Sequence, residues 1–161
     1  AEGRVSDSVA RLEMGLGLMN QAGADIYTPF FGGVYASALA DEGRMKQSTE
    51  IERDVVTKLD QGSEQWAAAE IYRMIADADY WHRGAVDKAI DGLQRAIEVA
   101  KGQDAKLWEL RATVSLARIW GDQGEKSQGL ALLTPVVEDF PIGGRDLADV
   151  AMARTLLQQL A

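Results

Sequence analysis

The sequence predicts an all-α protein, an α-α superhelix in which helical hairpins stack one on the next. Composition is one observation behind this prediction: only 3 of the 161 residues are proline, while alanine and leucine are abundant, and this balance favours helix over strand. A repeated phrase is the other. An apolar–small pair followed by a polar turn with glycine recurs about 40 residues apart, with the small residue at Ala36, Ala76 and Ala117. Repeats of this length are typical of stacked hairpins, because each unit buries its apolar face against its neighbours.

Two sets of landmarks define the repeat. The three alanines lie 40 and 41 residues apart, and the turn glycines Gly43, Gly84 and Gly124 lie 41 and 40 apart, so the middle copy carries one extra residue between them. Alanine lets two helix backbones approach closely, whereas a bulky side chain overpacks such a contact. We therefore expect the same contact between helices to be made three times.

A leading helix, three hairpins and a capping helix account for the chain, which we take as one domain over 1–161. The expected helices are Ser6–Gln21, then Thr28–Glu42 and Met45–Asp60 (hairpin 28–60), Glu64–Trp81 and Val86–Lys101 (hairpin 64–101), Ala105–Gly121 and Lys126–Asp139 (hairpin 105–139), and the capping helix 145–160. The expected N-caps are Ser63 and Asp104, and the expected helix stops are Gly23, Gly62 and Gly102.

The apolar stripes differ between the helices of each hairpin. The second helix of the middle hairpin has apolar residues at i, i+3, i+4 and i+7 from Val86 to Ala100, which indicates one buried face. In the first hairpin this stripe is thinner, with Ser48 and Glu52 on the same face as Val55 and Leu59, so we expect that hairpin to pack most loosely. The first helices are apolar on two sides, as expected of helices sandwiched between neighbours.

The hairpins resemble the tetratricopeptide (TPR-like) repeat family. In that family a bulky residue precedes an apolar–small pair, an aromatic residue follows three positions later, and a turn with glycine leads into a second helix. These places are taken by Thr113, Leu116, Ala117, Trp120, Gly124, Gly129, Leu133 and Val136 in the third hairpin, and by Tyr72, Ile75, Ala76, Ala89, Leu93 and Ala96 in the second. The sequence departs from the pattern at Asp79, where an aromatic is usual, at Gly129, where alanine is usual, and in its longer period.

A narrower resemblance covers residues 65–160 well and residues 5–60 more weakly. The phrases "AIDGLQRAIEVAKGQDAKLWELRATVSLARIWGDQG" and "ALLTPV" are similar to the C-terminal repeat region of bacterial signalling proteins. In those proteins a class III adenylate or guanylate cyclase domain precedes a P-loop ATPase module and then helical repeats. The resemblance implies that the chain is a C-terminal fragment of a larger protein, and the start at Ala1 without a leader fits that expectation.

Charge and composition exclude several classes of function. The formal net charge of −8 argues against nucleic acid as a partner, because a phosphate-binding surface needs surplus Lys and Arg. No apolar run approaches the roughly 20 residues that a membrane span needs, so we expect no membrane partner. The chain has no cysteine, which removes thiol chemistry and fits a reducing cytoplasm.

No catalytic constellation is visible, so we expect this segment not to be an enzyme. The one histidine, His82, sits in an expected turn without a cysteine nucleophile to pair with. Neither a phosphate-binding loop nor an EF-hand spacing occurs, so no cofactor and no metal are expected. Trp66, Trp81, Trp108 and Trp120 are expected to be packing residues.

The TPR-like resemblance implies a concave groove lined by the first helices of the hairpins. Carrying over the groove positions selects Phe30, Ser37, Arg73, Asp77, Tyr80, Trp81, Arg111, Val114, Arg118 and Asp122, together with Gly33, Asp41 and Glu70. Arg111 and Arg118 are seven residues apart, so both project from one helix face, and with Arg73 they form a candidate clamp for a carboxylate or an acidic peptide. The alternative is that these arginines pair with Glu70, Asp77, Glu109 and Asp122 and only brace neighbouring helices.

We therefore expect a non-catalytic, cytoplasmic interaction domain of a bacterial signalling protein. It would bind a protein or peptide segment, or its own cyclase or ATPase head domain, through the concave groove. Two alternatives stay open: sensing of an anionic metabolite near Tyr80, Trp81 and Arg118, and homodimerisation through the convex face or the closing helix.

Overall fold

The computed structural model is all-helical over the residues it describes, 2–62, 65–144 and 146–161. The helices are α1 (Glu2–Ala22), α2 (Thr28–Asp41), α3 (Met45–Asp60), α4 (Ala68–Arg83), α5 (Val86–Gly102), α6 (Lys106–Asp122), α7 (Lys126–Glu138) and α8 (Ala148–Leu160). Short 3-10 turns cover Asp25–Tyr27, Gln65–Ala67 and Ile142–Gly144. The expected N-cap Ser63, the expected helix start at Glu64 and Arg145 lie outside the described residues.

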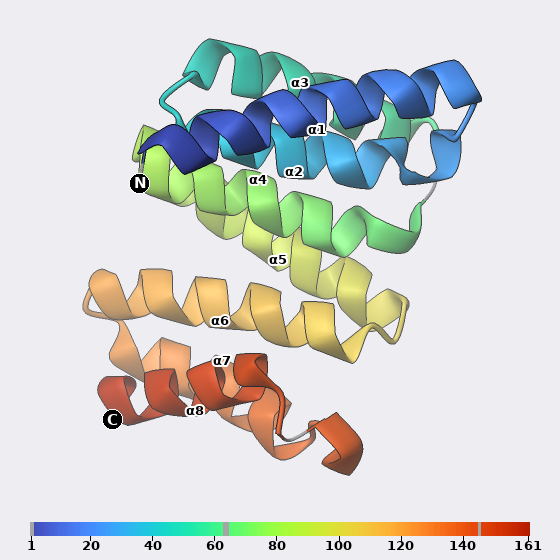
Figure 1. Ribbon diagram of the computed structural model, residues 1–161. Helices are drawn as coiled ribbons and strands as arrows, with labels where there is room; N and C mark the ends of the chain where they lie inside the picture. The colour runs from blue at the N-terminus through green and yellow to red at the C-terminus, as the bar shows by residue number, and fades with distance from the viewer. Residues whose placement is uncertain (1, 63–64, 145) are drawn as a thin grey trace.

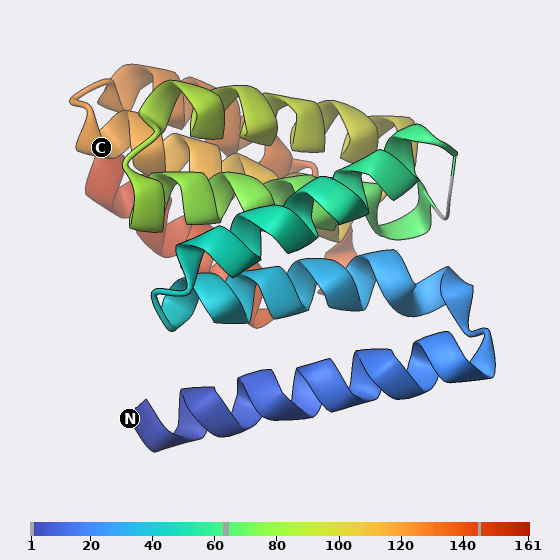
Figure 2. The same ribbon diagram turned by 90° about the horizontal axis from the view of Figure 1, so that it is seen from above.

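Helices α1–α4 lie at one end of a stack of helices and α6, α7 and α8 at the other, with α5 between them (Figure 1). Each helix packs against the next along the chain, and α2, α4, α6 and α8 also pack against one another in succession. These four helices therefore form one row, and α3, α5 and α7 each pack beside the row helix that precedes them. Helix α1 packs on α2 at the end of the stack, away from α6–α8 (Figure 2).

The repeat landmarks lie at equivalent places in the structure. Ala36, Ala76 and Ala117 are all at most 1% exposed and lie in α2, α4 and α6. Close helix contacts meet there: a Cβ added to Gly92 would lie 3.0 Å from the Cβ of Ala76, and one added to Gly129 would lie 3.0 Å from the carbonyl oxygen of Ala117. The sequence prediction of a close contact at these two alanines is confirmed.

The expected helix ends agree with the structure to within a few residues, and one of the turns corrects the prediction. The three turn glycines have positive φ, as do the expected stops Gly23 and Gly62. Between α5 and α6, however, Asp104 takes the left-handed conformation, with φ of 53°, and Gly102 is the last residue of α5. Asp104 is therefore not an N-cap: the N-cap residue of α6 is Ala105, which makes no side-chain capping bond. Aspartate tolerates this backbone region better than most residues with a side chain, which explains why it can replace a turn glycine.

Polar residues of the first hairpin form a buried network instead of a loose stripe. Ser48 and Glu52 are buried on α3, and Arg83 of α4 donates to both, at 3.1 Å and 3.0 Å. Arg83 also pairs with Asp79 at 3.0 Å, and Lys88 pairs with the other Asp79 oxygen at 2.9 Å. Asp79, which stands where the repeat pattern has an aromatic residue, is only 1% exposed. A buried aspartate is tolerated at this position because Arg83 pairs with it and also binds the polar residues of α3.

The tryptophans do not all pack as expected. Trp81 is 57% exposed, so the expectation that it is a packing residue is wrong. Trp66 lies 5.4 Å from Phe30 and 6.1 Å from Trp108 between ring centroids, and its Nε1 donates to the carbonyl of Ile26 at 3.0 Å. These rings join the beginnings of α2, α4 and α6.

We expect Arg83→Met to destabilise the protein by about 3 kcal/mol, because it leaves the carboxylates of Glu52 and Asp79 buried without their guanidinium. Urea unfolding measures this loss. The control is Arg11→Ala, which removes an exposed i,i+4 pair with Asp7 and should cost at most about 0.5 kcal/mol. Most of the loss should be recovered when the whole network is replaced, by Ser48→Ala, Glu52→Leu, Asp79→Leu and Arg83→Met together. Equal stability of Arg83→Met and Arg11→Ala would contradict the network.

Candidate functional site

Three adjoining hollows run along the row of helices α2, α4, α6 and α8. The hollow between α2 and α4 has about 190 Å³, and two further hollows between α4, α6 and α8 have about 240 Å³ and 270 Å³. Arg73 and Asp77 line both the first and the second, Arg118 lines both the second and the third, and Trp81 lines both the first and the third. Because the hollows share walls, we treat them as one groove, called the row groove below.

Eight of the ten sequence-predicted residues come together in the row groove. Its lining includes Ser37, Arg73, Asp77, Trp81, Arg111, Val114, Arg118 and Asp122. Tyr80 is not part of the lining, but its hydroxyl donates to Asp122 at 2.8 Å and its ring meets Trp81 edge to face at 4.7 Å. Phe30 lies elsewhere, in the aromatic group with Phe31 and Trp66. The structure therefore brings together residues from all three hairpins. Of these ten residues, Phe30 is the one that lies away from the groove.

Two of the three groove arginines are already engaged within the chain. Arg73 binds Glu70 through two parallel hydrogen bonds of 2.9 Å and also pairs with Asp77. Arg111 donates to Asp149 of α8 at 2.6 Å and approaches Glu70 at 3.4 Å. These contacts join α4, α6 and α8 by charge, as the bracing alternative anticipated for Arg73 with Glu70 and Asp77.

The third arginine is different. Arg118 is exposed, and no carboxylate of the described residues lies within 4.0 Å of its guanidinium. Trp81 lies near it across the groove, since both line the same hollow. Arg118 is thus an exposed cationic donor beside an exposed indole, with no close ion pair among the described residues, although its charge acts on Asp77 from farther away.

Burial and ion pairing shift the carboxylates of the groove in opposite directions. Burial raises the pKa of Asp77, although Arg73, a hydrogen bond from Ser115 and the charge of Arg118 act against that rise. The hydrogen bond from Arg111 lowers the pKa of Asp149 below its ordinary value of 3.8. Asp149 therefore stays ionised at neutral pH and holds α8 against α6.

Helix α8 supplies groove residues that the sequence analysis missed. Asp149 and Met152 line the second hollow, and Leu156, Gln159 and Leu160 line the third. Asp149 is not among the groove positions selected from the sequence. Its partner Arg111 is 38 residues away, so no local pattern in the sequence connects them.

The described residues contain no cluster of three or more His, Cys, Asp or Glu that could hold a metal ion. His82 lies in the last turn of α4 and not in a turn between helices, and its Nε2 is 3.0 Å from an Asp41 carboxylate oxygen. Of the described helices, none has the length and apolar character needed to cross a membrane.

Comparison with known proteins identifies the fold but no family. No family model matches the sequence, and no curated protein matches it. The structure is similar to the crystal structure of BtubC (BKLC) from P. vanneervenii, with a TM-score of 0.77 and 18% sequence identity over 99% of this chain. At that identity the likeness shows the fold alone, and this chain spans 65% of the length of that protein.

The Arg111–Asp149 pair predicts an acid-dependent loss of stability. Because the pKa of Asp149 is lowered in the folded state, its contribution is complete above pH 3.8 and is lost as the pH falls through the folded-state pKa. We expect Asp149→Asn to lower the free energy of unfolding by about 1 kcal/mol at pH 7, a modest value because Arg111 is partly solvated. Denaturant unfolding from pH 7 to pH 2 should show this difference shrinking at the acid end. Asp146→Asn is the matched control, and a difference that does not change with pH would contradict the pairing.

Proposed function

We propose that helices α1–α8 form a TPR-like superhelix whose row groove binds a segment of a partner protein without catalysis. The repeated alanines, the positive-φ turn glycines and the succession of contacts between α2, α4, α6 and α8 support the superhelix. The gathering of Ser37, Trp81 and Arg118 from three hairpins into one groove supports the binding role.

The single observation that carries the proposal is the exposed guanidinium of Arg118, which has no carboxylate within 4.0 Å among the described residues. An exposed cation outside any close ion pair can form charge-assisted hydrogen bonds to an incoming carboxylate, and the exposed ring of Trp81 offers an apolar contact beside it. We therefore propose an acidic segment with an adjacent apolar side chain as the occupant. The sequence predicted a clamp of three arginines. We propose that only Arg118 contacts the ligand, because Arg73 and Arg111 already have carboxylate partners.

The resemblance to the repeat tails of class III cyclase proteins suggests where the segment comes from. Under this proposal the partner is either another protein of a bacterial signalling system or the cyclase or ATPase head domain of the same polypeptide, in the cytoplasm. A groove formed before binding spends little free energy on ordering itself, which suits a regulatory contact.

Fluorescence anisotropy with labelled acidic peptides tests this proposal. We expect saturable binding that Arg118→Ala weakens about tenfold, equivalent to about 1.4 kcal/mol. Arg53→Ala is the control, because Arg53 is an exposed arginine of α3 outside the row groove. Equal affinity of the two variants, or no saturable binding by any acidic peptide, would remove the groove as the site.

A second candidate function is sensing of a small anionic metabolite. The third hollow favours it through its lining, because Arg118 and Lys126 lie there together with the indole of Trp81. Its volume of about 270 Å³ is slightly below the roughly 300 Å³ at which ligand pockets start, which restricts the ligand to a small anion. In a thermal-shift screen, a metabolite anion that raises the melting temperature of the wild type but not of Arg118→Ala would favour this function over peptide binding.

A further inference from the structure

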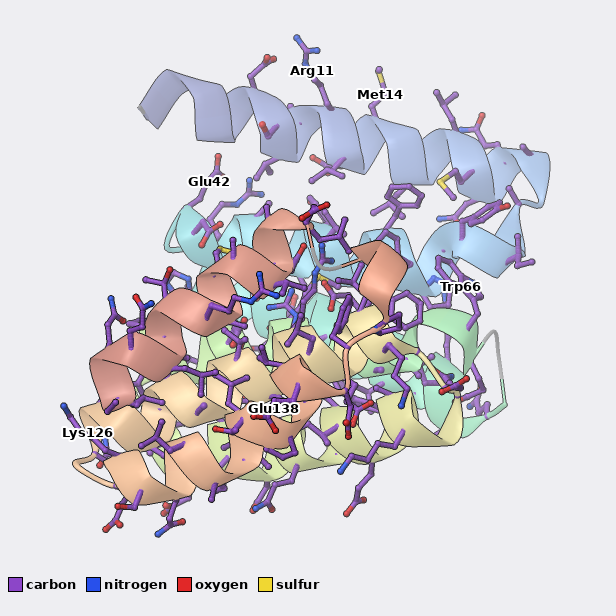
Figure 3. All side chains as sticks on the ribbon, turned by 90° about the horizontal axis from the view of Figure 1, so that it is seen from below. Arg11, Met14, Glu42, Trp66, Lys126 and Glu138 are labelled. Carbon is purple, nitrogen blue, oxygen red and sulfur yellow. The ribbon has the colours of Figure 1, made fainter. Side chains whose placement is uncertain are left out.

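A larger cavity lies outside the row groove, between α1, α2 and α3. It has about 420 Å³ and is lined by Glu13, Leu16, Gly17 and Asn20 of α1, Thr28, Gly32 and Tyr35 of α2, and Ile51, Asp54, Val55 and Lys58 of α3. Arg11 and Met14 point away from the rest of the protein on the outer side of α1 (Figure 3). The cavity therefore lies on the inner side of α1, and none of its lining residues is part of the row groove.

The repeat places a second cavity at an equivalent position. A hollow of about 290 Å³ lies between α5, α6 and α7. Six of its lining residues are each 81 residues after a residue of the larger cavity: the pairs are Thr28 and Glu109, Gly32 and Thr113, Ile51 and Leu132, Asp54 and Pro135, Val55 and Val136, and Lys58 and Asp139. A spacing of 81 is the sum of the two repeat lengths, 40 and 41. The cavity is thus a feature of the repeat and not of one irregular loop.

The middle hairpin shows what fills this position. The residue equivalent to Gly32, 40 positions later, is Tyr72, and the residue equivalent to Asp54, 41 positions later, is Arg95. The Arg95 guanidinium lies 4.1 Å from the centroid of the Tyr72 ring. In the middle hairpin, the position equivalent to the cavity is therefore occupied by an aromatic ring with a cation over it.

The first hairpin lacks both members of that pair and has the opposite charge. Glycine replaces the tyrosine, and Val55 takes the space next to it, because a Cβ added to Gly32 would lie 2.7 Å from the Val55 Cγ2. A carboxylate replaces the guanidinium. Glu13 adds a second carboxylate from α1, and neither Glu13 nor Asp54 has an ion-pair partner among the described residues. Lys58 is the one cation in the lining, so carboxylates outnumber cations at this cavity.

We propose that the cavity between α1, α2 and α3 binds a small aromatic amine in its protonated form. The ring of the ligand lies against Leu16, Ile51 and Val55, and its ammonium group lies at Glu13 and Asp54. The ligand thereby supplies a ring and a cation to this copy of the repeat, as Tyr72 and Arg95 do in the middle hairpin, with its ring packed on Val55 and not in the space next to Gly32. A volume of about 420 Å³ is within the range of small-molecule sites, which are mostly apolar with a few polar groups that fix orientation.

The charge of the cavity selects amines over acids of the same shape. Two carboxylates attract an ammonium ion and repel a ligand carboxylate. Burial raises the pKa of Tyr35 in the lining, and the charge of Glu13 raises it further, which places the Glu13 carboxylate within electrostatic reach of the cavity wall. The net charge of −8 of the whole chain acts in the same direction.

Titration of the isotope-labelled protein with tryptamine tests the proposal by amide chemical shifts. We expect saturable shifts at residues of α1, α2 and α3 that line the cavity, and no saturable shifts with indole-3-propionate, an acid with the same ring. Saturation by both compounds with equal affinity, or shifts confined to the row groove, would overturn the proposal.

Two variants on α1 provide a matched pair. Gly17 lines the cavity and Gly15 does not, and a Cβ added to either meets no atom within 4 Å. Gly17→Phe should fill the cavity and weaken tryptamine binding at least about tenfold, while Gly15→Phe should leave it unchanged. Glu13→Gln with Asp54→Asn, two changes of cavity-lining carboxylates, should also weaken binding about tenfold. Equal tryptamine affinity of Gly17→Phe and Gly15→Phe would show that the cavity is not the site.

Discussion

The close approach of successive helices at small residues is the constraint on which the rest of this structure depends. Ala76 meets Gly92 and Ala117 meets Gly129 at distances that leave no room for a larger side chain. Because α2, α4, α6 and α8 pack against one another in succession, the residues that directly follow the alanines, Ser37, Asp77 and Arg118, line the same groove. The row groove, and the cavities that recur at a spacing of 81 residues, both follow from this regular packing.

Charge is used in two different ways within this frame. The network of Ser48, Glu52, Asp79 and Arg83 replaces apolar contacts between α3 and α4, and a buried network of this kind is stable only when every member is satisfied. In the row groove, Arg73 and Arg111 join three helices by pairing with Glu70, Asp77 and Asp149. Most charged groups of the groove are therefore paired within the chain, and Arg118 is the arginine that can contact a ligand.

Local signals in the sequence predicted the helices well, since apolar periodicity and turn glycines are local. They failed where a residue takes an unusual role, as Asp104 does in replacing a turn glycine. The gathering of eight groove residues followed from the repeat, because residues at equivalent repeat positions lie side by side. The repeat did not predict that α8 contributes to the groove. The pairing of Asp149 with Arg111 depends on how the chain folds back after α7. Phe30 was misplaced for a similar reason: its neighbours Trp66 and Phe31 draw it into an aromatic group at the ends of the helices.

Equilibrium unfolding of a set of alanine-to-leucine variants tests the central constraint most directly. Ala36→Leu, Ala76→Leu and Ala117→Leu place a larger side chain at each of the three buried alanines, and Ala10→Leu and Ala151→Leu place it at exposed positions of α1 and α8. The account predicts a loss of about 1–3 kcal/mol at each of the three buried alanines and changes within about 0.5 kcal/mol at the two exposed ones. Full stability of the three buried variants would mean that the helices do not touch at these alanines, and the repeated contact would have to be abandoned.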